Sequence, residues 1–452
     1  MNTHERRKDV ELLDRCRQTV RCIERLGADT AEVYGEYTRS MSSTVEKHDL
    51  QISRSQTEAS FGIRAWIGGK VGFASTNSPD RLEEACSDAV TLAKASPEDE
   101  HNRPPRPREI RPMEGIYDPC AEDFSVDLAV GEAIRMIETA SALDSRVILG
   151  DAAFSADVYA RAIASSRGVE ASERGSLFSY YALTTAVDGE QISNFDFQFG
   201  ASRTAEGIDV APVVRRACVN ALGSLGATSG ESFVGDVLLT PSAVQELLVP
   251  LILFQTNARN VVRGMSRWGS SLGKSVAATH LSIVDRGRLP GGVGTAAFDR
   301  EGIPHEDCMI MVEGRLESLL HNTYTSEALG VANTGHASGS SRSVPGVGPT
   351  NLEIAPGHIE REALIADTRK GILVSRYSGN VDPVSGDFSG VAKGAYLIRN
   401  GKLERPVAGT LISGNLFEAL ARISGISSER DSLFNLILPT IRIDQVSITG
   451  SP

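Results

Sequence analysis

The sequence lacks the motifs that identify most metalloenzymes and nucleotide-binding enzymes. None of its eight histidines forms H-E-x-x-H, and no two are spaced to share one face of a helix. The pair His305 and Glu306 begins such a motif, but no second histidine follows, and we interpret it as part of a solvated loop. The glycine-rich segments also lack the Lys-Ser/Thr that completes a P-loop. The residues alone therefore indicate neither a metal centre nor a phosphate site.

A serine nucleophile is poorly supported as well. The segment "GSSLG" matches G-x-S-x-G with Ser271 at its centre. A nucleophile elbow needs an apolar strand immediately before it, whereas "VVRGMSRW" precedes the match here and follows a predicted helix. We interpret the match as chance in a chain rich in glycine and serine.

Paired cysteines, long apolar runs and excess positive charge are also missing. The six cysteines form no C-x-x-C, which indicates reduced thiols in a chain of this size. The longest apolar run, "LLVPLILF", is far too short to span a membrane, and the charged start has no apolar core for a signal peptide. The formal net charge of −12 opposes binding to phosphate backbones. We therefore expect a cytoplasmic protein that binds neither nucleic acid nor a membrane.

What is present is a chain of 452 residues with alternating helix and strand patterns, long enough for two or three domains. Residues 1–95 predict an N-terminal α/β domain that opens with an amphipathic helix over 6–27. Residues 96–112 hold five prolines among mixed charges and predict a linker. Residues 113–229 repeat the order helix, strands, helix as a middle α/β domain, which suggests a duplication. The predicted fold class is α+β, with helix-flanked antiparallel sheets in this half.

Residues 230–452 predict a larger, strand-rich C-terminal domain. It opens with one long helix over 240–264, for which Thr240 is the expected N-cap. Pro250 lies inside that helix pattern and is expected to kink it, because an interior proline costs about 3 kcal/mol.

The stretch 374–403, "VSRYSGNVDPVSGDFSGVAKGAYLIRNGKL", concentrates glycine and turn residues. Its Asn-Gly pair, Asn400 and Gly401, predicts a type I′ hairpin. Glycine at such density is typical of places where the backbone must approach something closely. We therefore expect the stretch to be a glycine-rich loop that lines a chamber.

Four motifs in the C-terminal half resemble those of the TldD/PmbA family. They are "FDREGIP" at 298–304, "ANTGHASGSSRSVPGVGPTNLEIAPG" at 332–357, "SGDFSGVAKGAYLIRNGKLERPVAG" at 385–409 and "GNLFEALARISGIS" at 414–427. The order of the predicted domains is also similar to that of the family. The resemblance therefore extends over nearly the whole chain.

The family has two branches, and the resemblance assigns this chain to one of them. TldD-like members carry H-E-x-x-x-H on a helix and a C-terminal cysteine, which together hold a zinc ion and make these proteins metallopeptidases. By resemblance, the three motif positions are Val249, Pro250 and Phe254 here, and no cysteine follows Cys308. Valine, proline and phenylalanine carry no donor for zinc. The chain is thus similar to the PmbA-like (TldE) branch, which lacks these ligands.

The resemblance implies a zinc-less PmbA/TldE-type subunit that forms a heterodimer with a TldD-like metallopeptidase subunit. The zinc would lie in the partner, this chain would hold no cofactor and no catalytic residue, and the pair would cleave peptides or unfolded polypeptides. This chain would wall the substrate chamber and be inactive alone. Two alternatives stay open: a homodimeric, non-catalytic binding or scaffold protein recruited to a biosynthetic pathway, and a metal-free hydrolase that uses Ser271 or His336.

Seven residues of the family motifs are candidates for the wall of the substrate chamber. Polar residues in loops mostly serve turns, so for each of them a structural role is the more frequent explanation. The candidates are Asn333, Thr334, Arg342, Asn351, Asp387, Phe388 and Ser389.

Overall fold

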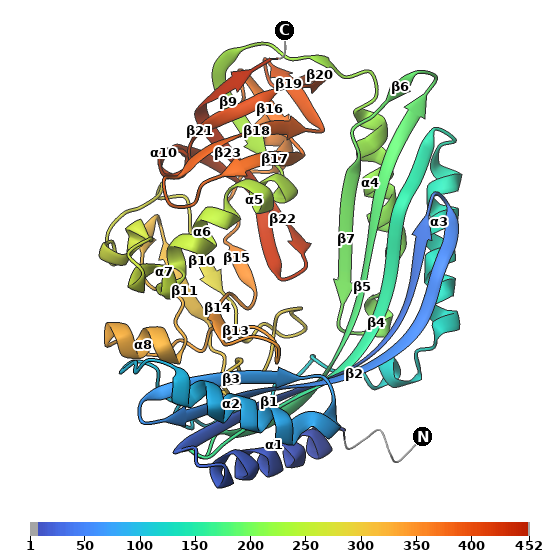
Figure 1. The fold of residues 1–452 in the computed structure, drawn as a ribbon. Coiled ribbons are helices and arrows are strands. Elements are labelled where there is room, and N and C mark those ends of the chain that lie inside the picture. The colour runs from blue at the N-terminus through green and yellow to red at the C-terminus, as the bar shows by residue number, and fades with distance from the viewer. Residues whose placement is uncertain (1–7, 451–452) are drawn as a thin grey trace.

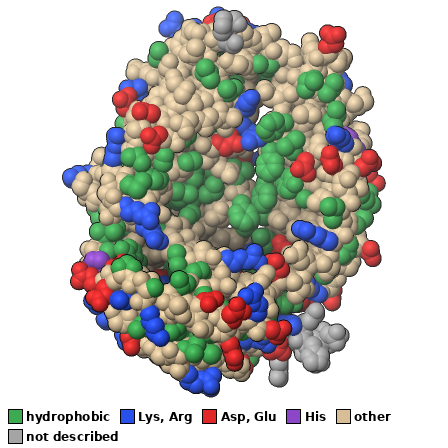
Figure 2. Space-filling view, viewed as in Figure 1, with side chains coloured by type: hydrophobic (Ala, Val, Ile, Leu, Met, Phe, Trp, Pro, Cys, Tyr) green, Lys and Arg blue, Asp and Glu red, His purple; other side chains and the backbone are tan. Residues whose placement is uncertain are grey.

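A computed structural model of the protein describes residues 8–450, which form two bodies on either side of a central hollow (Figures 1 and 2). The N-terminal body holds α1 to α4 and β1 to β7, and the C-terminal body holds β8 to β23 and α5 to α10. The predicted α+β class with a strand-rich C-terminal half is confirmed. No helix within 8–450 has the length and apolar character needed to cross a membrane. Positions 6 and 7 of the first predicted helix lie outside the described residues.

The N-terminal body is built on one antiparallel sheet of seven strands. The strand order is β3-β2-β1-β4-β5-β6, with β7 also paired to β5. The two predicted α/β units therefore share a single sheet, which is joined where β1 pairs with β4. The strands are β1 (Thr30–Glu46), β2 (Asp49–Ile67), β3 (Lys70–Thr76), β4 (Val147–Ser165), β5 (Glu170–Asp188), β6 (Gln191–Ile192) and β7 (Asp196–Ser202).

Four helices cover one face of this sheet (Figure 1). They are α1 (Lys8–Arg25), α2 (Leu82–Ala95), α3 (Val126–Leu143) and α4 (Val210–Gly223). Side chains alternate between the faces of a strand, and small residues at every second position of β4 let the helices pack closely. Ala152 and Ala156 lie in the core under α3 and α4, whereas Ala160 and Ala164 lie in the core under α1 and α2. The opposite face is therefore left to meet the C-terminal body and the hollow.

The C-terminal body is built on a sheet of fourteen strands with a separate two-stranded sheet, β13 and β14. Its strands are β8 (Thr228–Ser229), β9 (Phe233–Leu239), β10 (Ile283–Asp285), β11 (Cys308–Val312), β12 (Arg315–Leu316), β13 (Ala337–Ser338), β14 (Gly346–Val347), β15 (Leu352–Ile354), β16 (Lys370–Val374), β17 (Arg376–Val381), β18 (Asp387–Lys393), β19 (Ala395–Arg399), β20 (Lys402–Ala408), β21 (Leu411–Asn415), β22 (Ile423–Leu433) and β23 (Leu436–Thr449). Its helices are α5 (Pro241–Leu247), α6 (Val249–Thr256), α7 (Ala258–Val262), α8 (Thr323–Leu329), α9 (Arg361–Ala366) and α10 (Leu416–Ala421). Short 3₁₀ helices occupy Pro79–Arg81, Pro119–Asp123, Ala205–Gly207 and Arg267–Ser270.

The helix predicted over 240–264 is divided into three short helices, α5, α6 and α7. The first break falls at Leu248, so Pro250 lies in the first turn of α6, where its missing N–H removes no helical hydrogen bond. Thr240 does precede α5, but its side chain caps no helical N–H and instead donates to the carbonyl of Ser375 at 2.7 Å. Gly264 follows the end of α7 with φ +69°, as a terminal glycine should.

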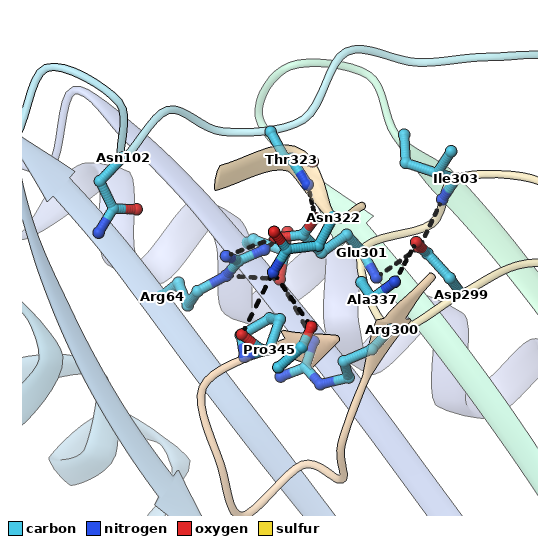
Figure 3. Close-up of polar contacts among 12 residues, drawn as sticks. Arg64, Asn102, Asp299, Arg300, Glu301, Ile303, Asn322, Thr323, Ala337 and Pro345 are labelled. Carbon is cyan, nitrogen blue, oxygen red and sulfur yellow. Dashed lines mark hydrogen bonds and ion pairs between the residues drawn. The ribbon is translucent and has the colours of Figure 1, made fainter. Parts of the chain in front are cut away.

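Buried charges join the two bodies. Arg64 of β2 pairs with Glu32 of β1 (Nη2–Oε2, 2.6 Å) and with Glu301 of the C-terminal body (Nη1–Oε1, 3.0 Å). Each of these side chains is at most 7% exposed. Arg300 lies 4.1 Å from the ring centroid of Tyr34 and contacts Glu32 at 3.4 Å. Figure 3 shows Arg64, Arg300 and Glu301 gathered between the sheet and the C-terminal body. The family-like segment 298–304 therefore fixes one end of the sheet to the second body.

Candidate functional site

The glycine-rich stretch 374–403 forms the β17–β18 hairpin and leads into the β19–β20 hairpin, so it is not the loop that its composition predicts. Strands β17 and β18 pair so that Gly379 lies opposite Gly390. A Cβ atom on Gly390 would come within 2.6 Å of both the Gly379 Cα and the Cζ atom of Tyr377. The Tyr377 ring of the same hairpin thus covers the glycine pair, and its hydroxyl donates to the carbonyl of Asn380 at 2.8 Å. These glycines make room for a side chain of the protein itself.

The turn between β17 and β18 is held rigidly and lies against α6. The carboxylate of Asp382 accepts the N–H of Val384 at 2.9 Å, and these backbone donors lower its pKa. From α6, the buried Gln255 donates its Nε2 to the carbonyl of Pro383 at 2.6 Å. Its Oε1 accepts the N–H of Arg267 at 2.7 Å. Gln255 therefore joins the helix, the turn and the segment that follows α7.

Helix α6 carries the three positions at which the family resemblance places the zinc ligands. Val249 is 4% exposed and belongs to the hydrophobic core of the C-terminal body, whereas Pro250 is exposed and Phe254 is half-buried. None of these side chains has a nitrogen, oxygen or sulfur atom, so they do not fit a zinc ion. Within residues 8–450, no three His, Cys, Asp or Glu side chains are placed to share a metal.

A second polar cluster surrounds His336, which follows two of the candidate lining residues. The ring of His336 lies between Thr334 Oγ1 (2.8 Å from Nδ1) and Asp285 Oδ2 (2.7 Å from Nε2). Burial raises the pKa of Asp285, but hydrogen bonds from His336 and Thr350 outweigh it and hold this pKa below its ordinary value. The side chains of His336 and Asp285 are 0% exposed. This cluster resembles a catalytic relay in composition, but no substrate can reach its histidine.

The metal-free hydrolase gains no support from this geometry. Thr334 Oγ1 also accepts the N–H of His321 at 2.8 Å and donates to the carbonyl of the same residue at 3.2 Å, so its hydroxyl is fully used. Ser271 donates to the carbonyl of Arg267 at 3.4 Å, and no histidine of the described chain is hydrogen-bonded to it. Ser271 and His336 therefore belong to separate structural networks.

The other candidate lining residues fall in four different places. Asn333 Nδ2 donates to Thr323 Oγ1 at 3.1 Å. Asn351 is buried, accepts the N–H of Gly294 at 2.8 Å and donates to the carbonyl of Arg286 at 2.8 Å.

Arg342 is instead 55% exposed and pairs with Glu58 of β2 at 3.3 Å. On β18, Asp387 and Ser389 are exposed, whereas Phe388 is buried against Tyr377. The structure does not gather the seven residues into one site, and their contact with a substrate stays a prediction.

Two polar features near these residues were not predicted from the sequence. One is Gln255, whose only signal is a single amide inside a strongly apolar helix segment. The other is the pairing of His336 with Asp285, two residues that lie 51 positions apart in the chain and have no common motif. Such contacts depend on how distant loops meet, which spacing along the sequence does not report.

Three profiles of one protein family match most of the chain. The PmbA/TldA metallopeptidase domain 1 matches residues 31–93, the central domain matches 121–225, and the C-terminal domain matches 232–450. These matches cover nearly all of the N-terminal sheet, the helices α2 to α4 and the C-terminal body from β9 onward, whereas α1 lies outside them.

Individual proteins show the same likeness along nearly the full length. An uncharacterised protein of Methanocaldococcus jannaschii is 28% identical over 84% of this chain and 88% of its own. A metalloprotease PmbA homolog of Haemophilus influenzae is 25% identical over 93% of this chain and 92% of its own. The crystal structure of TldE from Thermococcus kodakarensis superimposes with a TM-score of 0.88 over 96% of this chain and 100% of that chain, at 21% identity. The last comparison shows a shared fold.

Proposed function

Because the chain belongs to the PmbA/TldD metallopeptidase family, we propose that it acts as the zinc-less, TldE-type subunit of a heterodimeric peptidase. The partner is a TldD-like subunit with an intact H-E-x-x-x-H, and the substrates are peptides or unfolded polypeptides in the cytoplasm. The observation that carries the proposal is α6, which contains Val249, Pro250 and Phe254, the residues that the family resemblance assigns to the positions of the metal ligands. Three side chains without a nitrogen, oxygen or sulfur atom cannot hold a zinc ion or activate its water.

The architecture is consistent with a chain that encloses and orients the substrate. The exposed face of the N-terminal sheet and the C-terminal body border a hollow with hydrophobic side chains along its walls (Figure 2). Such a hollow can hold an extended polypeptide. The buried His336 cluster cannot contact a polypeptide that lies there. In the proposed complex, zinc in the partner activates water, and this subunit encloses and orients the polypeptide.

Assembly and metal content test the proposal together. We expect the chain to co-elute with a TldD-like subunit of the same organism at a ratio of one to one during size-exclusion chromatography. The dialysed complex should contain one zinc, and the chain alone should contain none. A partner in which the motif glutamate is replaced by glutamine is the control, because it should keep both assembly and metal. A chain that holds one zinc by itself, or that remains a homodimer beside the partner, would contradict the proposal and favour the scaffold alternative.

A further inference from the structure

Strand β7 forms a free edge of the N-terminal sheet beside the hollow (Figure 1). Among the described residues, it pairs only with β5, from Asp196 opposite Thr184 to Ser202 opposite Phe178. Its other edge has no strand partner in the described chain. A row of unpaired backbone N–H and C=O groups is a template for a further strand. The edge of β7 is therefore suited to a segment in an extended conformation.

A pocket of about 290 Å³ opens next to this edge. Phe199 of β7 meets Phe434 at the tip of the β22–β23 hairpin, with ring centroids 5.5 Å apart. Phe434 stays 47% exposed although it adopts φ +58°, a conformation that phenylalanine rarely takes. The volume lies near the lower end of ligand sites, at roughly 300 Å³, and suits one large side chain. The lining residues are Phe197, Gln198, Phe199, Ser242, Gln245, Glu246, Arg376, Leu433 and Phe434.

The charges that line the pocket neutralise each other. Arg376 and Glu246 form an ion pair at 2.6 Å, and the same arginine lies 5.2 Å from the ring centroid of Phe195. The other lining side chains are aromatic, aliphatic or uncharged and polar. A charged side chain would lose its hydration here and gain no unpaired partner. The pocket is therefore complementary to an uncharged, apolar side chain.

We infer that β7 and this pocket form a polypeptide-binding site, in which an extended segment pairs with the free edge and places one aromatic or large aliphatic side chain in the pocket, against Phe199 and Phe434. The inference rests on the proposed function, because the occupant is the substrate that the partner cleaves. Backbone pairing gives affinity without regard to sequence, and the pocket selects the side chain. The site thus assigns to the zinc-less subunit a preference for apolar residues in the substrate.

Fluorescence anisotropy of labelled peptides with the intact chain tests the site without any partner subunit. The probe is an uncharged six-residue peptide of threonine and valine with one central phenylalanine, and its match has glycine at that position. We expect the phenylalanine peptide to bind at least about tenfold more tightly, because the pocket removes its ring from water. Equal affinity for the two peptides, or no binding of either, would overturn the inference.

A substitution at the hairpin tip tests the pocket. Phe434→Asn removes the ring, and asparagine tolerates the positive φ at this position, so the fold should be retained. We expect about tenfold weaker binding of the phenylalanine peptide and no change for the glycine peptide. Leu403→Asn is the matched control, because Leu403 is 44% exposed on β20 and lies outside the pocket. If the control weakens binding as much as Phe434→Asn does, the pocket is not the site.

Backbone methylation tests the strand edge independently of any protein variant. In an extended segment, the N–H groups of neighbouring residues point to opposite sides. Of two peptides N-methylated at neighbouring positions, only the one whose methyl group faces β7 should lose binding. If both retain binding, the segment does not pair with β7. If two copies of the chain associate instead and the peptide does not compete, the edge belongs to an interface between copies. If these tests fail but the chain still co-elutes with the partner subunit, only the binding site is refuted. If the chain binds the peptide but does not co-elute with the partner, only the proposed function is refuted.

Discussion

At the scale of single residues, buried charges hold the two bodies together. Arg64 bridges Glu32 and Glu301, and none of the three is more than 7% exposed. Removing one member of a buried ion pair leaves an uncompensated charge, which costs far more than the loss of a surface pair. The contact between the bodies therefore depends on a complete network rather than on apolar area alone.

We predict that Arg64→Met lowers the free energy of unfolding by about 3–5 kcal/mol, because the buried Glu301 then loses its cation and Glu32 keeps only Arg300 at 3.4 Å. The midpoint of urea unfolding, followed by circular dichroism, measures this loss. The control is Arg135→Met on α3, which breaks a pair with Glu132 at an arginine that is 54% exposed. That variant should change stability by less than about 1 kcal/mol. Equal effects of the two substitutions would contradict the structural role of the network.

A buried carboxyl group on β7 makes stability depend on pH. Burial raises the pKa of Asp196 from 3.8 to about 6, and the amide of Gln198 at 2.7 Å counters this only in part. Well below pH 3.8 the group is protonated in both the folded and the unfolded chain. As pH rises through 6, the folded chain must ionise a buried acid that the unfolded chain ionises easily, so stability falls.

We therefore predict that Asp196→Asn stabilises the protein at pH 7.5 relative to its effect at pH 4. The difference should be about 2–3 kcal/mol, since each pKa unit corresponds to about 1.4 kcal/mol. Thermal unfolding of the variant and the unsubstituted chain at both pH values measures it. A change in melting temperature that is the same at both pH values would show that Asp196 does not titrate in this range.

At the scale of elements, turns were predictable where the chemistry is local. Gly68 and Gly69 both adopt positive φ between β2 and β3, and Asn400 and Gly401 do so between β19 and β20, as their sequence signals predict. The pairing of β1 with β4 was not predictable, because it joins residues more than one hundred positions apart and no local signal sets its register.

The glycine-rich hairpin shows a different limit of sequence analysis. The density of glycine in β17 and β18 correctly indicated a close approach of the backbone. What approaches is Tyr377, which occupies the space above Gly379 and Gly390. Glycine in a sequence indicates that a position cannot hold a side chain, but not which group occupies the space. Here the space is occupied by a side chain of the same hairpin.

The predicted linker over 96–112 has one site that trypsin can cut. Three of its arginines precede proline, which blocks trypsin, so only the bond after Arg108 is open to cleavage. The segment is mostly exposed, although Pro105 is buried and Asn102 accepts a hydrogen bond from Trp66. We predict that brief trypsin treatment cuts first after Arg108, as mass spectrometry of the fragments would show. First cleavage within 240–440 would instead mean that the linker is firmly packed.

At the scale of the whole molecule, the sequence indicated the class and the family, and the structure supplied the arrangement. The predicted boundaries at 95, 112 and 229 stay predictions, because the first two units share one sheet and are not separated by a gap. The candidate site was predicted as one chamber wall, yet its seven residues lie in separate networks. The pocket at β7 combines segments from both bodies, and no motif marks a site assembled in that way.

In the proposed function, this chain contributes shape and its partner contributes the chemistry. Its described residues offer no metal-binding group of three ligands, and its buried histidine is shut off from solvent. A polypeptide can instead enter the hollow and reach the free edge of β7. In the proposed complex, catalysis requires a second, zinc-bearing subunit.

Cleavage of an internally quenched fluorescent peptide tests this claim most directly, with this chain, a TldD-like subunit and their equimolar mixture measured side by side. We predict no cleavage by the chain alone and cleavage by the mixture, which is abolished when the partner's motif glutamate is replaced by glutamine. Asp387→Ala and Arg342→Ala in this chain should weaken cleavage without abolishing it. A partner that cleaves equally well alone and does not co-elute with this chain would contradict the account.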